Sequence, residues 1–126
     1  MRVLVTGAAG FSGARMMELL AAQQGIVPVG LVHRPLPATA QKKDSFVVAD
    51  LLNPQQLSAA LLKAEPDAVI HCAGLTHGPA GDLDAANVTG TKNLLDATIS
   101  ANPDCRVLVV SSSAVYGYAG DQPIPE

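Results

Sequence analysis

Residues 1–13 read MRVLVTGAAGFSG, and this stretch decides the fold. An apolar run, Arg2–Thr6, breaks into glycines at Gly7, Gly10 and Gly13. A strand that turns sharply into a helix beneath a ligand needs residues without a Cβ. Gly7 suits the tight turn, Gly10 lets backbone N–H groups approach a pyrophosphate, and Gly13 lets the helix pack closely on the strand. The helix N-terminus then offers N–H donors and partial positive charge to phosphates, so the stretch predicts a dinucleotide-binding turn.

Beyond this turn, predicted strands alternate with predicted helices. Five runs rich in Val, Leu and Ile are continuous, which is typical of parallel strands covered on both faces. The runs are Arg2–Thr6, Ile26–His33, Ser45–Ala49, Ala68–Cys72 and Arg106–Ser111. Helical patterns cover Gly13–Gln24, a stretch from Pro54 (capped by Asn53) to Ala64, and Leu83–Ala101. We predict one α/β domain over residues 1–126, a Rossmann-type doubly wound parallel sheet with strand order 3-2-1-4-5.

Composition excludes several classes of function. The chain has a net charge of −3 with scattered Lys and Arg, and only two Phe and two Tyr for base stacking, so we expect no nucleic-acid partner. No window approaches the ~20 apolar residues of a membrane span, and the first residues do not form a signal peptide. Three scattered histidines give no metal-ligand spacing. We expect a cytoplasmic protein in which Cys72 and Cys105 are reduced and buried.

Four further stretches stand at the ends of predicted strands or inside the last helix. They are Asp50-Leu51, His71-Cys72-Ala73-Gly74, Asn87-Val88-Thr89-Gly90-Thr91 with Asn93-Leu94-Leu95, and Ser111-Ser112-Ser113-Ala114-Val115-Tyr116-Gly117. With the G-x-x-G-x-x-G turn, they resemble the extended short-chain dehydrogenases/reductases, the NAD(P)-dependent epimerase/dehydratase family that modifies nucleotide sugars. The motifs follow the family's order and spacing over the whole chain.

Several of these residues also have a physical interpretation of their own. Asp50, just past a strand, can accept from an adenine amino group or cap a turn. Gly74 allows backbone to approach a ligand at the carboxyl edge of the sheet. Asn87 is a poor helix former in mid-helix, which suggests a role for its side chain, and Gly90 suggests close packing against the sheet. His71 ends an apolar strand and is expected to be structural rather than catalytic.

The resemblance implies a cofactor site and a substrate site. The cofactor positions are Gly7, Ala9, Gly10, Phe11, Ser12, Gly13, His33, Arg34, Asp50, Leu51, Cys72, Ala73, Gly74, Asn87 and Ser111. The substrate positions are Thr76, Ser112 and Ser113. In the family, a Ser or Thr four residues before the Y-G tyrosine bonds the reacting sugar oxygen. Counting back from Tyr116 gives Ser112 as the catalytic hydroxyl, with Ser111 and Ser113 as second choices.

The end of the second predicted strand bears on the choice of cofactor. An acidic residue there would bind the ribose 2′-OH of NAD, but the sequence has Leu31-Val32-His33-Arg34. A cationic Arg34, helped by His33, suits the 2′-phosphate of NADP. We therefore favour NADP over NAD. The alternatives are that Arg34 is a solvated loop charge, or that it stacks on adenine without a 2′ preference.

The family's Tyr-x-x-x-Lys pair is missing, because Gly120 follows Tyr116 by four residues and Gln122 follows Tyr118. The end of the chain, Gln122–Glu126, resembles a P-x-x-E segment that precedes that pair in relatives. We expect the N-terminal part of a longer protein, without its substrate domain. A homodimer through the helix Leu83–Ala101 is a further hypothesis.

The expected parent acts on a nucleotide-diphosphate sugar, with hydride transfer at C4. Its nearest resemblance is to 4-keto-6-deoxy-sugar nucleotide reductases such as GDP-4-keto-6-deoxymannose reductases. A UDP-glucose 4-epimerase or a 4,6-dehydratase stays open, although Ser113-Ala114 stands where dehydratases often have Asp-Glu. A non-catalytic dinucleotide-sensing module is the alternative from another class.

Overall fold

The computed structural model describes residues 1–35, 45–112, 115 and 117. The predicted positions Ser113 and Tyr116 lie outside these residues, as does the P-x-x-E segment. Within them, the sheet contains β1 (Arg2–Thr6), β2 (Val27–Val32), β3 (Phe46–Val48), β4 (Ala68–His71) and β5 (Arg106–Val109). The strands are parallel and lie in the order β3-β2-β1-β4-β5. The predicted fold class and strand order are thus confirmed.

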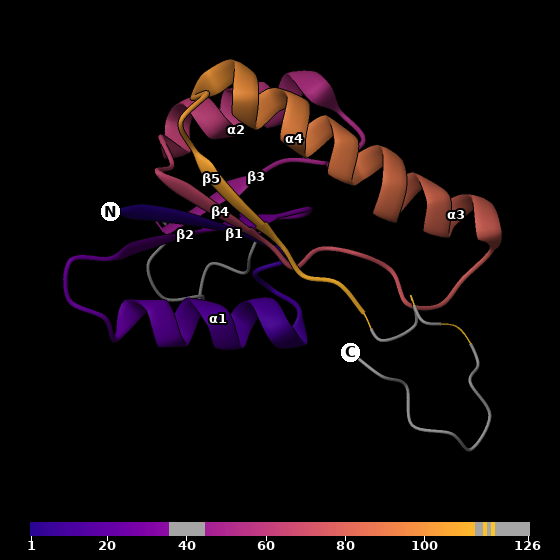
Figure 1. Ribbon diagram of the computed structural model, residues 1–126, viewed down its shortest axis with the longest axis horizontal. Coiled ribbons are helices and arrows are strands. Elements are labelled where there is room, and N and C mark those ends of the chain that lie inside the picture. Colours follow the sequence, from indigo (N-terminus) through magenta and orange to yellow (C-terminus); the bar gives the residue numbers. More distant parts are fainter. Residues whose placement is uncertain (36–44, 113–114, 116, 118–126) are drawn as a thin grey trace.

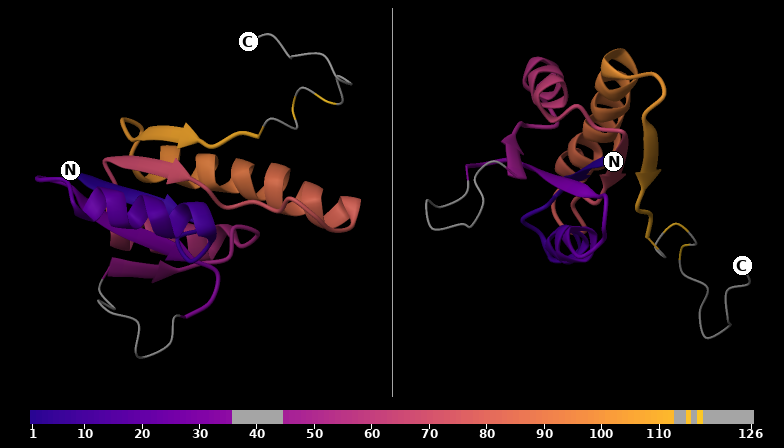
Figure 2. Two further views of the ribbon diagram at one scale, coloured as in Figure 1. Left: turned by 90° about the horizontal axis from the view of Figure 1, so that it is seen from below. Right: turned by 90° about the vertical axis from the view of Figure 1, so that its left-hand side faces the viewer.

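Helices cover both faces of this sheet (Figures 1 and 2). Helix α1 (Phe11–Ala21) lies alone on one face, where it packs on β1 and β2. Helices α2 (Pro54–Ala64) and α4 (Gly90–Ala101) lie side by side on the other face. Before α4 come the short α3 (Ala80–Asp84) and η2, a π-helical turn over Ala85–Thr89. The chain is therefore a three-layer sandwich, with β1 at the centre of its middle layer.

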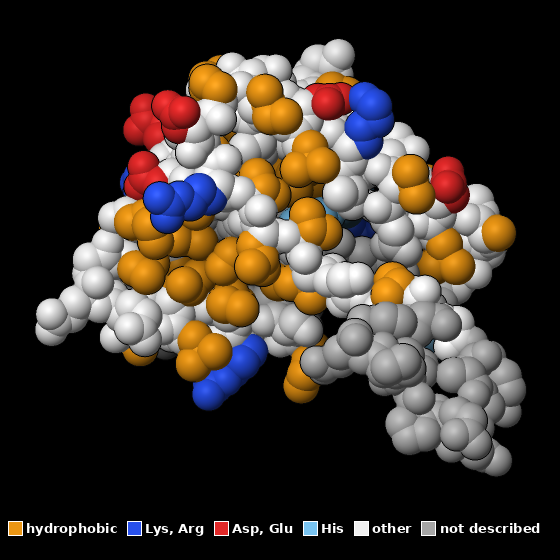
Figure 3. Space-filling view, viewed as in Figure 1, with side chains coloured by type: hydrophobic (Ala, Val, Ile, Leu, Met, Phe, Trp, Pro, Cys, Tyr) orange, Lys and Arg blue, Asp and Glu red, His pale blue; other side chains and the backbone are white. Residues whose placement is uncertain are grey.

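The core lies between the sheet and the α2–α4 face. Its largest members, Leu4 of β1, Leu57 and Leu61 of α2 and Leu94 of α4, are fully buried. The opposite face is thinner, because Gly13 is the only buried residue of α1. Hydrophobic side chains stay exposed there, including Leu108 of β5 at 56% (Figure 3).

The helix ends follow the expected chemistry. Asn53 caps α2, since its Oδ1 accepts from the backbone N–H of Gln56 at 3.1 Å, and Pro54 follows as the first helical residue. Helix α2 ends at Glu65, whose φ of 45° is left-handed. Helix α1 begins at Phe11, two residues before the predicted start, because Gly10 serves as its N-cap.

Two predictions need correction. The last helical stretch begins at Ala80 rather than Leu83, and the π-helical turn interrupts it. Neither thiol is fully buried: Cys72 and Cys105 are free and partly exposed. Helix α1 packs on β1 and β2 rather than on β4, which Cys72 follows. Cys105 precedes the edge strand β5 and packs only partly against the core. Partial burial still raises the pKa of Cys72, and burial together with the charge of Asp67 raises the pKa of Cys105.

Candidate nucleotide-binding site

The glycine turn after β1 has the geometry that its sequence predicts. Gly7 has a φ of 65°, a left-handed conformation that side chains disfavour. Its carbonyl accepts from the N–H of Gly10 at 2.8 Å. A Cβ added at Gly13 would lie 2.1 Å from that same carbonyl oxygen. Gly13 therefore permits the first turn of α1 to rest directly on the end of β1.

The N-terminus of α1 lies at this turn, with Gly10 as its N-cap. Gly10 is extended, with φ −83° and ψ 172°, and no side chain caps the helix. The first N–H groups of a helix have no partner within the helix, so an uncapped N-terminus favours an anion. Ala9, Gly10, Phe11 and Ser12 are exposed around it, Phe11 at 98%. The predicted phosphate-binding segment is thus accessible.

A cavity of about 500 Å³ lies at the carboxyl edge of the sheet beside this turn. Its walls come from the ends of β2, β3 and β4, and from the turn before α4. Six predicted cofactor residues line it: Gly7, His33, Asp50, Leu51, Ala73 and Gly74. Seven other lining residues were not predicted: Leu31, Ala49, Leu52, Leu75, Asp82, Ala85 and Ala86. Asp82, Ala85 and Ala86 share one helical face, a spacing of three and four residues that could have indicated them.

Other predicted residues do not line the cavity. Gly10 and Gly13 belong to the turn, as do Ala9, Phe11 and Ser12. Arg34 is exposed, directly after the lining residue His33. Ser111 and Ser112 are exposed beyond β5, and exposed Thr76 bonds the ring of His77 at 2.8 Å. The structure therefore brings six of the predicted cofactor positions together at the cavity, while Ser111 and the predicted substrate hydroxyls Thr76 and Ser112 lie on exposed segments after β4 and β5.

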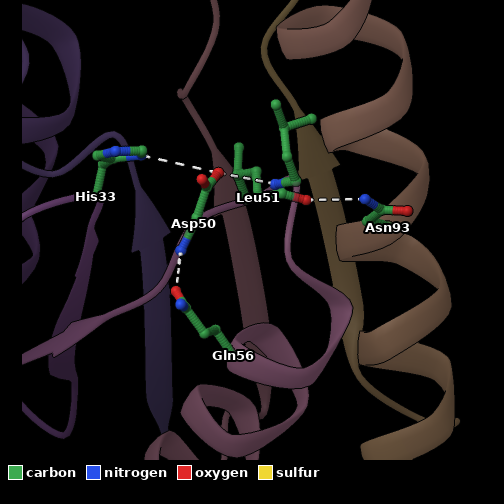
Figure 4. A network of polar contacts seen from close by, with 6 residues as sticks. His33, Asp50, Leu51, Gln56 and Asn93 are labelled. Carbon is green, nitrogen blue, oxygen red and sulfur yellow. Dashed lines mark hydrogen bonds and ion pairs between the residues drawn. The ribbon is translucent and has the colours of Figure 1, made fainter.

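The loop after β3 is held from two helices (Figure 4). The Asp50 N–H donates to Gln56 Oε1 of α2 at 2.9 Å, and Asn93 Nδ2 of α4 donates to the Leu51 carbonyl at 2.9 Å. Asp50 Oδ1 accepts from the Leu52 N–H at 2.9 Å and lies 3.8 Å from His33 Nδ1. Asp50 therefore does cap a turn, and among the described residues no donor binds its Oδ2.

Gly90 packs on this same loop. A Cβ at Gly90 would lie 3.2 Å from the Leu51 Cβ. The glycine thus permits α4 to approach the β3–α2 loop rather than a strand of the sheet, which corrects the predicted contact. The loop that carries Asp50 is consequently pinned against α4.

Asn87 holds the segment after β4. It lies in the π-helical turn, where its Oδ1 accepts from the Leu75 N–H and its Nδ2 donates to the Leu75 carbonyl, both at 2.8 Å. A Cβ at Gly74 would lie 2.9 Å from Asn87 Oδ1. The predicted side-chain role of Asn87 is confirmed as a clamp on the lining residue Leu75.

Replacing Asn87 by alanine should free this segment. Both hydrogen bonds to Leu75 would be lost, and each is worth about 1 kcal/mol. We expect amide hydrogen exchange at Leu75 to speed up at least about tenfold. Asn102→Ala is the matched control, because Asn102 also bonds backbone groups, of Pro66 and Asp104, but on the opposite edge of the sheet. Unchanged exchange at Leu75 in Asn87→Ala would contradict the clamp.

His71 is buried, at 2% exposure, and both its ring nitrogens are hydrogen-bonded. Its partners are Thr6 of β1 and Thr91 of α4. Burial lowers the pKa of the imidazole, which is therefore neutral at neutral pH. These contacts agree with the structural role predicted for His71; that it takes no part in catalysis stays a prediction.

Comparison with known families identifies the fold's relatives. The model of the NAD dependent epimerase/dehydratase family matches residues 3–126. This chain belongs to that family. Members of the epimerase/dehydratase family with similar sequences include the GDP-6-deoxy-D-mannose reductase of Pseudomonas aeruginosa, 36% identical over 98% of the chain. The GDP-6-deoxy-D-talose 4-dehydrogenase of Aggregatibacter actinomycetemcomitans is 31% identical over 93% of the chain.

Among solved structures, the UDP-glucose 4-epimerase of Brucella ovis, in complex with NAD, superposes on 99% of this epimerase/dehydratase family chain. The TM-score is 0.80 and the sequence identity is 32%. The chain spans 38% of the length of the Pseudomonas reductase, 37% of the Aggregatibacter dehydrogenase and 40% of the Brucella structure. It thus corresponds to only part of each of these three proteins.

None of the helices among the described residues is long and apolar enough to cross a bilayer. In the same part of the chain, no three His, Cys, Asp or Glu residues come together as metal ligands would.

Proposed function

We propose that this chain is the dinucleotide-binding part of a nucleotide-sugar oxidoreductase or epimerase. The observation that carries the proposal is the glycine turn that opens α1 beside the cavity of about 500 Å³. Ligands of open parallel α/β sheets bind at the carboxyl ends of the strands. Here that edge combines an uncapped helix N-terminus with an apolar cavity, which are the complements of a pyrophosphate and an adenosine.

The residues present fit such a cofactor. The turn from Gly7 to Gly13 has no space for a Cβ at either end, so its backbone would cradle the pyrophosphate. Leu31 and Ala49 would form an apolar floor under the adenine, and Asp50 Oδ2 would accept from its amino group. When bound, the nicotinamide would supply or accept a hydride at C4 of the sugar.

On the sugar side, Ser112 is the proposed hydroxyl that steadies the reacting oxygen, with Ser111 and Thr76 beside it. The Tyr-x-x-x-Lys pair would come from a part of the protein beyond these 126 residues. We propose a 4-keto-6-deoxy-sugar nucleotide reductase as the first candidate. The end of β2, Leu31-Val32-His33-Arg34, has no acidic residue, and Ser113-Ala114 stands where dehydratases often have Asp-Glu. A UDP-glucose 4-epimerase is the second candidate, since the Brucella epimerase is similar over almost the whole chain.

A non-catalytic dinucleotide sensor is the candidate from another class. Such a sensor needs the glycine turn and the cavity but has no use for Ser112. Steady-state turnover by a longer form of the protein, abolished by Ser112→Ala at unchanged cofactor affinity, would exclude it. Cofactor binding without turnover of any nucleotide sugar would favour it.

The cofactor preference is testable on this chain by titration calorimetry with NADPH and NADH. We expect NADPH to bind about 10- to 100-fold tighter, because one hydrogen bond to a charged group is worth roughly 1.5–3 kcal/mol. Arg34→Asp should remove or reverse this preference, since it repels a 2′-phosphate and can accept from a 2′-OH. Lys63→Asp, the same change of charge in the last turn of α2, is the control that should keep it.

Equal affinity for NADPH and NADH in the unaltered chain would make Arg34 a solvated charge and favour NAD. A folded chain that binds neither nucleotide would contradict the proposal that these 126 residues suffice for cofactor binding.

A further inference from the structure

The two hydroxyls that flank His71 have other partners, and these fix the direction of each hydrogen bond. His71 Nδ1 lies 2.6 Å from Thr6 Oγ1, and Nε2 lies 2.9 Å from Thr91 Oγ1. The Thr91 hydroxyl donates to the Asn87 carbonyl at 2.7 Å. A threonine hydroxyl has one hydrogen, so toward the ring Thr91 can only accept. The proton of the imidazole is therefore on Nε2.

The other side of the ring agrees with this assignment. The neutral imidazole has one donor and one acceptor nitrogen, so Nδ1 accepts from the Thr6 hydroxyl. Thr6 Oγ1 in turn accepts from the Ala73 N–H at 3.1 Å. The bonds thus run in one direction, from Ala73 through Thr6, His71 and Thr91 to the carbonyl of Asn87.

The series of hydrogen bonds closes on itself. Asn87, whose carbonyl ends the series, also clamps Leu75 with its side chain. Leu75 is two residues after Ala73, where the series begins, and Gly74 lies between them. We call this closed set the His71 network; its members are Thr6, His71, Ala73, Leu75, Asn87 and Thr91. Ala73, Gly74 and Leu75 all line the cavity.

We propose that His71 is a positioning residue for the nucleotide cavity. As the neutral Nε2–H tautomer, it completes the His71 network, which fixes the backbone of Ala73–Leu75 against the ligand. The inference rests on the proposed nucleotide binding. It goes further by assigning to a buried, non-catalytic histidine a required charge state and tautomer.

Protonation of His71 would disrupt the single direction in which the hydrogen bonds of the His71 network run. A second proton on Nδ1 turns that nitrogen into a donor, so Thr6 Oγ1 would accept from both His71 and Ala73 and its own hydrogen would lose its acceptor. A buried donor without a partner is costly. The His71 network holds Ala73 and Leu75 only when the imidazole is neutral, so nucleotide should bind the protein with neutral His71 better.

Among the residues that the structure describes, no acidic side chain is placed to stabilise an imidazolium at His71. Charged or titratable side chains on the packed elements are Arg2 on β1, Asp67 before β4, Cys72 after β4, Arg106 on β5, and Lys92 and Asp96 on α4. Arg2 is at the far end of β1, where its Nε donates to the Ala64 carbonyl, and Lys92 pairs with Asp96. Arg106 and Asp67 lie at the starts of their strands, whereas His71 ends β4. Within the described ranges, no carboxylate forms an ion pair with His71.

The first test is the tautomer, measured by ¹⁵N NMR of the histidine rings in the full 126-residue chain at pH 7.5. We expect a protonated, pyrrole-type Nε2 and an unprotonated Nδ1. As the pH is lowered, the amides of Ala73 and Leu75 and the side-chain amide of Asn87 should shift together with His71. The Nδ1–H tautomer would overturn the proposal, and so would amides that ignore the titration. Should the chain unfold before His71 protonates, the tautomer at pH 7.5 decides alone.

The second test is the pH profile of NAD⁺ affinity. NAD⁺ is the probe because it has no 2′-phosphate, a group whose own pKa near 6 would confuse the profile. Below the pKa of His71, we expect affinity to fall by up to about tenfold per pH unit. His71→Asn should flatten the profile, because the titrating group is gone, whereas His77→Asn on the exposed loop should keep it. A wild-type profile in His71→Asn would overturn the proposal.

Matched variants separate positioning from simple packing. Thr6→Val keeps shape but removes the hydroxyl, and Thr6→Ser restores it, so serine should retain NAD⁺ affinity and valine should lose about tenfold. If Thr6→Val does not fold, Thr91→Val against Thr91→Ser makes the same comparison at a partly exposed residue. Equal affinity in the valine and serine variants would overturn the proposal. Absence of NAD⁺ binding with the expected tautomer and coupled amide shifts would instead count against the proposed function of this chain alone.

Discussion

Gly13→Ala should destabilise the fold by about 3 kcal/mol and remove dinucleotide binding. The added Cβ would lie 2.1 Å from the Gly7 carbonyl oxygen, 2.6 Å from its carbon and 2.9 Å from the Ala8 Cα. All three are backbone atoms, which cannot rotate away as a flexible side chain can. The first turn of α1 must therefore separate from the end of β1, which opens the phosphate-binding turn.

A second glycine makes this test sharp, because the same substitution should have the opposite sign there. Gly81 lies in α3, and a Cβ added to it would meet nothing within 4 Å. Gly81→Ala should stabilise the chain by up to about 1 kcal/mol through helix propensity. Urea unfolding measures both free energies, and calorimetry measures NADPH and NADH binding. A Gly13→Ala chain as stable as the unaltered one would show that the turn relaxes, and would remove the steric argument for Gly13.

Leu4→Ala should cost about 3–4 kcal/mol of folding free energy. Leu4 lies on β1 at the centre of the sheet and is fully buried in the core beneath α2 and α4. Truncation would leave a cavity bounded on both sides by secondary structure, which limits how far the site can collapse. The loss is a large fraction of the 5–15 kcal/mol typical of a domain.

The control for this prediction is Leu62→Ala, in the same helix as the core residues Leu57 and Leu61. Leu62 is 67% exposed, so its truncation should change stability by no more than about 0.5 kcal/mol. Urea unfolding monitored by circular dichroism compares the two variants. Similar losses at both positions would mean that the core is not concentrated between the sheet and the α2–α4 face.

Local sequence was sufficient to predict the sheet and the glycine turn after β1. Continuous apolar runs indicate buried parallel strands, and the requirement for glycine at Gly7 and Gly13 arises within a few residues of chain. The role of Asn87 was predicted only in part. Its misfit to a helix indicated a task, but its partner Leu75 is chosen by the tertiary fold, and the π-helical turn that presents it has no local signal.

The same limit explains the lining residues that were missed. Asp82 lies before the predicted helix start at Leu83, because α3 begins at Ala80. Ala85 and Ala86 lie inside the predicted helix, but only the tertiary fold turns that part of it toward the cavity. Asp50 was predicted with two alternatives. The structure shows the turn cap, because Oδ1 accepts from the Leu52 N–H, whereas a contact with adenine stays a prediction. The partial exposure of the cysteines depends on how the helices and the edge strand β5 are placed around them, which local sequence does not specify.

The central place of β1 has a consequence for folding during synthesis. In the finished sheet Arg2 pairs with Val27, and Val3 pairs with Ala68, much later in the chain. At about 5–20 residues per second, a ribosome takes several seconds to produce β4 after β1 has emerged. Pairings between segments so distant in sequence also form slowly. A nascent chain that has not yet reached Ala68 therefore carries the central strand of its sheet with one edge lacking a native partner.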